Sequence, residues 1–465
     1  MTDWMRGSTR HIAIESAMDP GLSRRSQKVL AVAGGGGGGG APQQQWQSQQ
    51  HYTIDRDGDD ASPAALIDLS RATNEVAHAE LLEFFKSTVG ENVTSEVFAT
   101  PASPGYHDGR CEPRLRCALA AFFNTNFNPV HAVRPEHIVV TAGATEAIEG
   151  LVDAVCDEGD GIVVVGPCWP TLIPTLTLKH SLNLTLAKPP TYNHWDNYLL
   201  PSLQASYDFS TAKSRIKAVL LCNPNTPLSR CYPRETLLDL MEFCQERNLH
   251  LICDEVGALL NVNAGEGGGR CERAPGFVSA LSLTEPLARE GARKVDPSRV
   301  HVVWSGSKLF GVGGLKVGCI ISQSSPPILS ALSTLTPRPS TLPAHYLTSL
   351  LSWSQLPTLL ALTNERLTSS YHVLAAFLQR HDIEFVVPTH GVVLFARLAR
   401  TAANKAEEKR FFEALERGGV RVGRGEKYGG VERCWGWAGL GFGVGRGVME
   451  EAVGRMEGVM VRKRR

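Results

Sequence analysis

The chain has 465 residues, and its 47 lysine and arginine residues balance 47 aspartate and glutamate residues. This length exceeds the roughly 100 to 150 residues typical of one domain, so we expect several domains or one large two-lobed enzyme. Hydrophobic residues make up 43% of the chain and charged residues 20%, which excludes a chain kept disordered by excess charge. A net charge of zero argues against nucleic acid or an anionic membrane surface as the main partner.

The cysteine pattern and the apolar runs indicate the class of protein and its compartment. Eleven cysteines are scattered along the chain without the CxxC pairing of a zinc site, so no metal is expected. No apolar run approaches the roughly 20 residues that a membrane helix needs, and the start of the chain lacks the pattern of a secretory signal. We therefore expect a cytoplasmic protein with reduced thiols and no membrane partner.

The composition changes along the chain and suggests four segments. Residues 1–55 contain seven consecutive glycines followed by a glutamine-rich stretch, which predicts a disordered leader. Residues 56–104 are expected to form an N-terminal arm and part of a small domain. Residues 105–330 alternate apolar runs with amphipathic stretches, which predicts a large α/β domain, and 331–465 a smaller α+β domain.

Short apolar runs in the large domain are typical of strands that are buried on both faces. The expected strands are 138–141, 162–166, 216–222, 249–254 and 300–304, and the expected helices are 112–123, 146–156 and 234–247. Right-handed crossovers then give a mostly parallel sheet flanked by helices. A loop-rich insertion with a short helix is expected over 261–297, and the runs 386–398 and 434–444 are expected to form a small sheet in the C-terminal domain.

Polar side chains follow several of these strands, where open parallel sheets bind ligands. Lys308 comes shortly after the strand 300–304, and a lysine that is desolvated there can form a Schiff base. Asp254 ends the strand 249–254, and Asn223 follows the strand 216–222. Taken singly, each residue is also what a surface lysine or a strand-terminating turn would supply.

Two further strand ends carry features of a cofactor site. The sequence Thr141-Ala142-Gly143-Ala144-Thr145 precedes a helix, whose free backbone N–H groups and dipole favour a phosphate. Trp169 follows the strand 162–166 and offers an aromatic ring. The alternatives are that Thr145 only caps the helix and that Trp169 belongs to the core.

In this order, the five strand ends resemble those of fold-type I pyridoxal-phosphate enzymes of the class I/II aminotransferase family. The subgroup is the one that looks like ACC synthases and fungal specialised-metabolism aminotransferases. The resemblance covers about residues 60 to 460 and rests on RLRCALAAFFNTNFNP, PEHIVVTAGATEAIEGL, NPNTPLSRCY and VHVVWSGSKLFGVGGLKVG. It implies an α/β fold with a large cofactor-binding domain and a smaller C-terminal domain.

The resemblance also implies pyridoxal 5'-phosphate as the cofactor and assigns roles to single residues. Lys308 would form the Schiff base and carry the proton of the substrate's α-carbon, while Asp254 would keep the ring nitrogen protonated. Asn223 would bond the phenolic oxygen of the ring, and Trp169 would stack on the ring face. The residues implied for the phosphate are Gly143, Ala144, Thr145, Ser305 and Lys316.

Tyr106 resembles the aromatic residue that such enzymes donate across a subunit interface. The resemblance therefore implies a homodimer with active sites built from both chains.

Four positions depart from the pattern of the family. Gly257 stands where a tyrosine usually gives the phenolic oxygen a second hydrogen bond, and Lys316 replaces a phosphate-binding arginine. Gly439 stands where a GWxR motif supplies the arginine that clamps the substrate's α-carboxylate. Thr73 replaces the glutamate of the AEN stretch of ACC synthases, which argues against ACC synthase activity.

Three functional readings remain open from the sequence. The first is an aminotransferase acting on a small amino-acid-derived substrate in fungal secondary-metabolite biosynthesis. The second is a carbon-sulfur lyase of a thiolated diketopiperazine pathway, since a substrate whose α-carboxylate is tied up in an amide gives reason to lose the arginine. The third is a degenerate, non-catalytic family member, against which the retention of Lys308, Asp254 and Asn223 argues.

Overall fold

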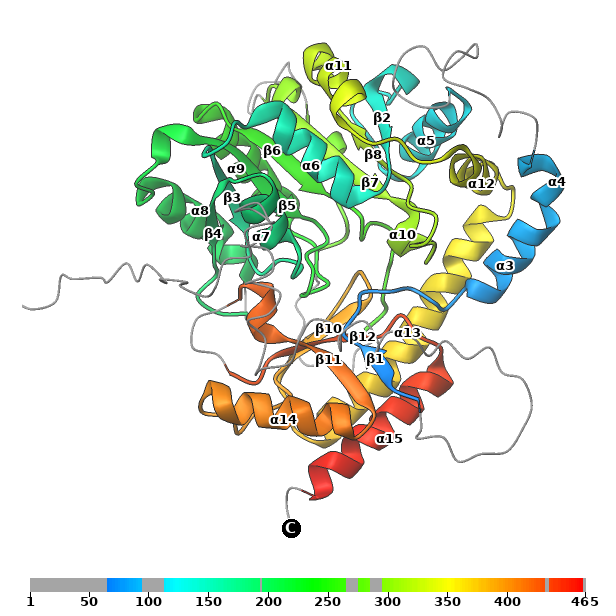
Figure 1. Ribbon diagram of the computed structural model, residues 1–465, viewed down its shortest axis with the longest axis vertical. Helices are drawn as coiled ribbons and strands as arrows, with labels where there is room; N and C mark the ends of the chain where they lie inside the picture. Colours follow the sequence, from blue (N-terminus) through cyan, green and yellow to red (C-terminus); the bar gives the residue numbers. More distant parts are fainter. Residues whose placement is uncertain are drawn as a thin grey trace, which may run out of the picture.

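The computed structural model describes residues 65–93, 113–192, 195–264, 275–284, 295–430 and 435–462. The expected leader, Tyr106 and most of the insertion 261–297 lie outside these ranges. The described chain forms two lobes, each built on its own sheet (Figure 1). The four segment boundaries expected from composition stay a prediction.

The large lobe contains a seven-stranded sheet in the order β2-β8-β7-β6-β5-β3-β4. Its strands are β2 (Ile138–Thr141), β3 (Gly161–Val165), β4 (Asn183–Ala187), β5 (Ile216–Cys222), β6 (His250–Asp254), β7 (Val300–Ser305) and β8 (Gly318–Ile321). All five expected strands form within one residue of the expected ends. The strand β8 was not expected and runs antiparallel to both of its neighbours, whereas β3 to β7 are parallel, as the alternation of strands and helices predicted.

Helices cover both faces of the large sheet (Figure 1). The α-helices of this lobe are α5 (Pro113–Asn126), α6 (Ala144–Val155), α7 (Leu172–Pro174), α8 (Leu199–Asp208), α9 (Arg234–Glu246), α10 (Gly306–Leu309), α11 (Pro326–Leu335) and α12 (Thr341–Leu351). Short turns of 3-10 or π helix lie at Pro135–His137, Thr175–Lys179, Trp195–Tyr198, Lys213–Arg215, Ala280–Ser282 and Pro297–Arg299. Alternate strand residues belong to two different apolar clusters, since Val163 packs in one and Val164 in the other. The sheet is therefore buried on both faces, which explains its continuous apolar runs.

The small lobe contains a five-stranded sheet in the order β1-β11-β12-β10-β9. Its strands are β1 (Ile67–Leu69), β9 (Phe385–Val386), β10 (Val393–Ala396), β11 (Val420–Arg424) and β12 (Ala438–Gly441), and its helices are α3 (His78–Ser87), α4 (Val89–Asn92), α13 (Leu356–Arg380), α14 (Lys405–Arg417), the 3-10 helix η8 (Gly425–Tyr428) and α15 (Arg446–Arg462). The two runs expected to form a small sheet supply β10 and β12, which pair antiparallel. The strand β1 joins this sheet from the other end of the chain by pairing parallel to β11.

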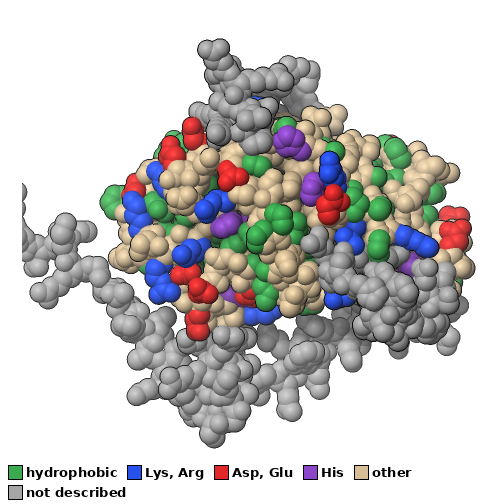
Figure 2. All heavy atoms as spheres, turned by 90° about the horizontal axis from the view of Figure 1, so that it is seen from above, with side chains coloured by type: hydrophobic (Ala, Val, Ile, Leu, Met, Phe, Trp, Pro, Cys, Tyr) green, Lys and Arg blue, Asp and Glu red, His purple; other side chains and the backbone are tan. Residues whose placement is uncertain are grey.

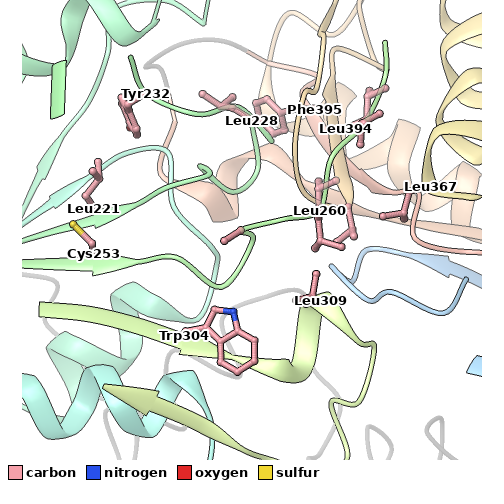
Figure 3. Close-up of a cluster of buried hydrophobic side chains, with 14 of the residues drawn as sticks. Leu221, Leu228, Tyr232, Cys253, Leu260, Trp304, Leu309, Leu367, Leu394 and Phe395 are labelled. Carbon is pink, nitrogen blue, oxygen red and sulfur yellow. The ribbon is translucent and has the colours of Figure 1, made fainter. Parts of the chain in front are cut away.

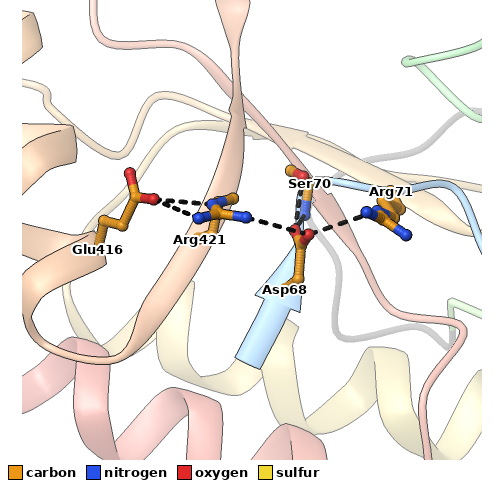
Figure 4. Close-up of polar contacts among 5 residues, drawn as sticks. All are labelled: Asp68, Ser70, Arg71, Glu416 and Arg421. Carbon is orange, nitrogen blue, oxygen red and sulfur yellow. Dashed lines mark hydrogen bonds and ion pairs between the residues drawn. The ribbon is translucent and has the colours of Figure 1, made fainter. Parts of the chain in front are cut away.

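Polar contacts hold β1 in the small sheet. Asp68 of β1 lies opposite Arg421 of β11 in the strand register, and their charged groups approach to 3.7 Å. Arg71 lies 3.4 Å from the same carboxylate, and Glu416 accepts from Arg421 at 2.6 Å (Figure 4). Such partly exposed pairs contribute little singly, but as a network they fix the register of β1.

The two lobes share one apolar core. Trp304 and Leu309 of the large lobe belong to the same cluster as Leu394 and Phe395 of β10 (Figure 3). On the face seen in Figure 2, basic and acidic side chains are interspersed. No helix in the described ranges is long and apolar enough to cross a membrane.

Candidate active site

The site lies at one edge of the large sheet, where several strands end in register. Asp254 at the end of β6 pairs with Cys222 at the end of β5, and Ser305 at the end of β7 pairs with Gly318 at the start of β8. Thr141 at the end of β2 pairs with the same glycine. The polar strand ends that the sequence indicated are thus neighbours in space.

Lys308 lies on the single-turn helix α10, directly after β7. The Ser305 hydroxyl caps this helix by accepting the Ser307 N–H at 3.1 Å. The Lys308 amine donates to the carbonyl of Ala72. Burial lowers the pKa of Lys308, and the neighbouring Lys316 lowers it further, while Asp254 opposes both effects. A partly desolvated amine of this kind is suited to nucleophilic chemistry.

Asp254 is buried at the edge of the sheet next to Lys308. Burial raises the pKa of its carboxyl group to about 6, against the stabilising effects of the Val256 N–H, Trp169, Lys308 and Cys222. The Val256 N–H donates at 3.2 Å, and the Cys222 sulfur lies 3.8 Å from the carboxylate. A buried carboxylate without a full complement of partners is suited to a cationic ring nitrogen.

The expected phosphate site lies at the start of α6, which begins with Ala144 after Gly143 at φ +119°. A Cβ on Gly318 would lie 2.6 Å from the carbonyl carbon of Gly143 and 2.9 Å from the Ala144 nitrogen, so only glycine allows this approach. Through Gly318 the start of α6 comes next to Ser305. The glycine cradle and the free N–H groups fit the phosphate of pyridoxal phosphate.

Two predicted phosphate-site residues have side chains at the surface. Thr145 in the first turn of α6 is exposed. Lys316 is also exposed and lies two residues before Gly318, close enough to affect Lys308. Both stay predicted phosphate ligands, and their exposure leaves them free to contact a bound anion.

Trp169 and Asn223 are the two residues expected around the cofactor ring. The indole nitrogen of Trp169 is buried and lies near Asp254, where it lowers the pKa of the carboxyl group, although it forms no hydrogen bond of full geometry with a described residue. The side chain of Asn223 bonds backbone groups at both ends, accepting from Tyr232 N at 3.2 Å and donating to Val278 O at 3.0 Å. Its proposed bond to the phenolic oxygen therefore depends on its second amide hydrogen or on a change of partner.

Two residues of the site had no clear signal in the sequence. Asn74 donates to the carbonyls of Lys308 and Leu309, at 2.9 Å and 3.1 Å, so it positions the lysine. Cys222 contacts Asp254 directly. Asn74 is the asparagine of the stretch that was compared with AEN, and only that comparison could have singled it out.

One departure from the family pattern, Gly439, is covered by another side chain. A Cβ on Gly439 would lie 2.5 Å from the hydroxyl oxygen of Tyr428, so no arginine fits there without moving this tyrosine. Arg446, the first residue of α15, bonds Glu450 and Ser369. Arg433 and Tyr106 lie outside the described residues. The predicted homodimer stays a prediction.

Comparisons with known proteins agree with this geometry. The family model for "Aminotransferase class I and II" matches residues 72–436. The "Probable aminotransferase aclI" of Aspergillus oryzae is 34% identical over 406 residues, which cover 85% of this chain and 90% of that protein. The "Probable aminotransferase tcpI" of Claviceps purpurea is 33% identical over 399 residues, covering 84% and 88%.

The fold likeness extends to solved structures at lower identity. Aspartate aminotransferase from Thermus thermophilus with maleate matches with a TM-score of 0.68 and 19% identity, covering 94% of this chain and 99% of that chain. This likeness confirms the expected fold-type I architecture. Because the family model matches well over half of its length, the chain belongs to the class I and II aminotransferases, a family that depends on pyridoxal phosphate.

Proposed function

We propose that this chain is a pyridoxal-phosphate-dependent aminotransferase that acts on an amino-acid-derived substrate in fungal secondary metabolism. The observation that carries the proposal is the meeting of Lys308 and Asp254 at the ends of neighbouring strands, with pKa shifts of opposite direction. Similarity to aclI and tcpI supports the metabolic setting.

When bound, pyridoxal phosphate supplies an electron sink for charge that develops at the substrate's α-carbon. Asp254 is the residue that would hold a proton on the ring nitrogen. Lys308 is the base that would remove the α-proton and return it elsewhere, and burial lowers its pKa toward the range where it can do so. Gly143, Ala144, Thr145, Ser305 and Lys316 would hold the phosphate, and Trp169 would cover the ring.

The test is trapping of the cofactor on the protein. Purified protein with added pyridoxal phosphate should show a visible absorbance band, and borohydride should fix the label on the peptide that contains Lys308. Absence of the band, or a label on other lysines, would contradict the proposal and favour a degenerate, non-catalytic scaffold.

A second candidate is carbon-sulfur elimination in a thiolated diketopiperazine pathway. The observation that favours it is the tyrosine that covers Gly439, because it removes the place from which an arginine would hold a free α-carboxylate. The α-carboxamide of an S-alkylcysteine distinguishes the two reactions: transamination yields a keto amide and leaves the sulfur attached, whereas elimination and hydrolysis of the enamine release a free thiol together with pyruvamide and ammonia.

A further inference from the structure

Two glycines that face each other across neighbouring strands, Gly423 and Gly439, leave a notch in the small sheet. Gly423 of β11 pairs with Gly439 of β12. A Cβ on either glycine would collide with the hydroxyl of Tyr428, at 2.5 Å in the case of Gly439. The phenol of Tyr428 therefore occupies space that two side chains would otherwise fill.

The described aromatic side chains that pack around this phenol are apolar. Phe395 packs edge-on against the Tyr428 ring with centroids 5.7 Å apart, and Trp437 stacks on Phe395 at 5.1 Å. Burial raises the pKa of Tyr428 to about 12, and no charge or hydrogen bond of the described residues contributes to the shift. At neutral pH the group is an uncharged donor, and no cation among the described residues shifts its pKa.

Tyr428 and the two glycines, Gly423 and Gly439, together form one wall. On one side, close contacts connect this wall to Lys308. Gly441, two residues after Gly439, lies against the carbonyl of Arg71, where a Cβ would collide. The next carbonyl along, that of Ala72, accepts the Lys308 amine. The strand that carries Gly439 is therefore separated from Lys308 by one extended segment.

On the other side, the wall is linked to the expected ring-stacking residue. The carbonyl of Tyr428 accepts the Cys168 N–H at 2.9 Å, and Trp169 follows directly. Trp169 in turn acts on Asp254. Tyr428 thus belongs to the wall of the proposed active site and not to a remote part of the small lobe.

We propose that Tyr428 is a specificity-determining residue that makes this wall neutral, so that the site takes amino compounds whose α-carboxyl group is an amide. This inference rests on the proposed function, because it assumes that a substrate amine is brought to Lys308. A free carboxylate buried against aromatic rings without a cation loses its hydration uncompensated, whereas an amide loses less and its carbonyl can accept the Tyr428 hydroxyl.

The steric part is tested without any ligand, by a double-mutant cycle on thermal unfolding. Gly439→Ala should lower the Tm of the full chain with native Tyr428 and should lower it much less in the Tyr428→Ala background. Equal effects in both backgrounds would show that Tyr428 does not fill the notch, and would overturn the inference.

The specificity part uses S-benzylcysteine and its α-carboxamide as paired probes, with the ligand concentration that gives an equal rise in Tm as the readout. Wild type should bind the amide at least tenfold better, Tyr428→Phe should lower this preference severalfold, and Gly439→Arg combined with Tyr428→Ala should reverse it. Tyr346→Phe, on α12, is the matched control and should leave the preference unchanged. Better binding of the free acid by wild type, or a preference that Tyr428→Phe leaves intact, would overturn the inference.

Borohydride labelling of Lys308 distinguishes a failure of the proposed function from a failure of the role assigned to Tyr428. A labelled wild type with no amide preference contradicts the role of Tyr428 and leaves the aminotransferase proposal standing. An unlabelled wild type contradicts the proposed function, and with it this inference, even if the amide binds more tightly.

Discussion

Asp254 and Lys308 act on each other's pKa against the effect of burial: the lysine lowers the pKa of the buried carboxyl group, and the carboxylate raises the pKa of the buried amine. Each group thereby helps to keep the other ionised, whereas burial alone would favour the neutral form of both. Removing either group is therefore expected to change the ionisation of the other as well as its own chemistry.

Lys308→Ala should abolish borohydride-trapped cofactor and all turnover, because Lys308 is the lysine that follows the end of β7 directly. Lys316→Ala is the matched control. It should keep the label on Lys308 and weaken cofactor affinity by about tenfold, since it would remove one proposed charge-assisted phosphate contact. Mass spectrometry of the reduced protein measures the label, and a labelled Lys308→Ala protein would remove the lysine from its assigned role.

Asp254→Ala should still capture the cofactor but should slow α-proton exchange on the order of 10²- to 10³-fold, because it removes the charge proposed to keep the ring nitrogen protonated. Loss of deuterium from an α-deuterated amino acid, followed by NMR, measures this step without product formation. An unchanged exchange rate would show that another group holds the ring nitrogen.

Glu255 makes stability depend on pH. Burial raises the pKa of its carboxyl group to about 8, and the group accepts from Ala280 N at 2.7 Å and bonds the Ser279 hydroxyl at 2.6 Å. The pKa of Glu255 in the folded protein lies above the unfolded value of 4.5. The contribution of its protonated carboxyl group to the free energy of unfolding is therefore fully present below pH 4.5 and is lost as the pH rises toward 8.

Glu255→Gln should remove this dependence, because glutamine matches the protonated carboxyl group at both contacts. Between about pH 5 and 8 the free energy of unfolding of wild type should fall more steeply than that of the variant, by up to about 1.4 kcal/mol per pH unit. Urea unfolding at pH 5.5, 6.5 and 7.5 measures the difference. Parallel curves for the two proteins would place the Glu255 pKa near its ordinary value.

Gly311→Ala should be strongly destabilising, by about 2 to 4 kcal/mol. Gly311 has φ +69°, and a Cβ there would collide with the carbonyl of Asn74, which positions Lys308. Gly313→Ala is the control, since it is exposed with nothing within 4 Å, and it should stay within about 0.5 kcal/mol of wild type. Equal unfolding midpoints for the two variants would contradict the close packing of the turn against Asn74.

The sequence was sufficient for the parallel strands of the large lobe, because a run such as 216–222 is apolar except for Lys217 and is followed by the polar Asn223. It was insufficient for β8, whose four residues lack a recognisable period and whose direction is set by pairing with β2 and β7. The strand β1 was missed for the same reason, since its partner β11 lies some 350 residues away.

In the candidate site, too, local sequence signals were predicted and long-range contacts were missed. Lys308 and Asp254 were noticed because they lie just after or at the end of an apolar strand, which is a local signal, and the family resemblance supplied their roles. Gly439 was noticed only as a missing arginine, whereas the tyrosine that covers it depends on the register of β11 and β12 and on the path of η8. Contacts of this kind are set by tertiary structure and leave no spacing in the sequence.

The extended segment after β1 is hydrogen-bonded to both lobes within a few residues. Ala72 receives the Lys308 amine and Asn74 bonds α10 of the large lobe, while Glu75 N donates to Gly443 O of the small lobe at 2.6 Å. Any rotation of the small lobe against the large lobe would therefore also move the carbonyl that accepts the Lys308 amine.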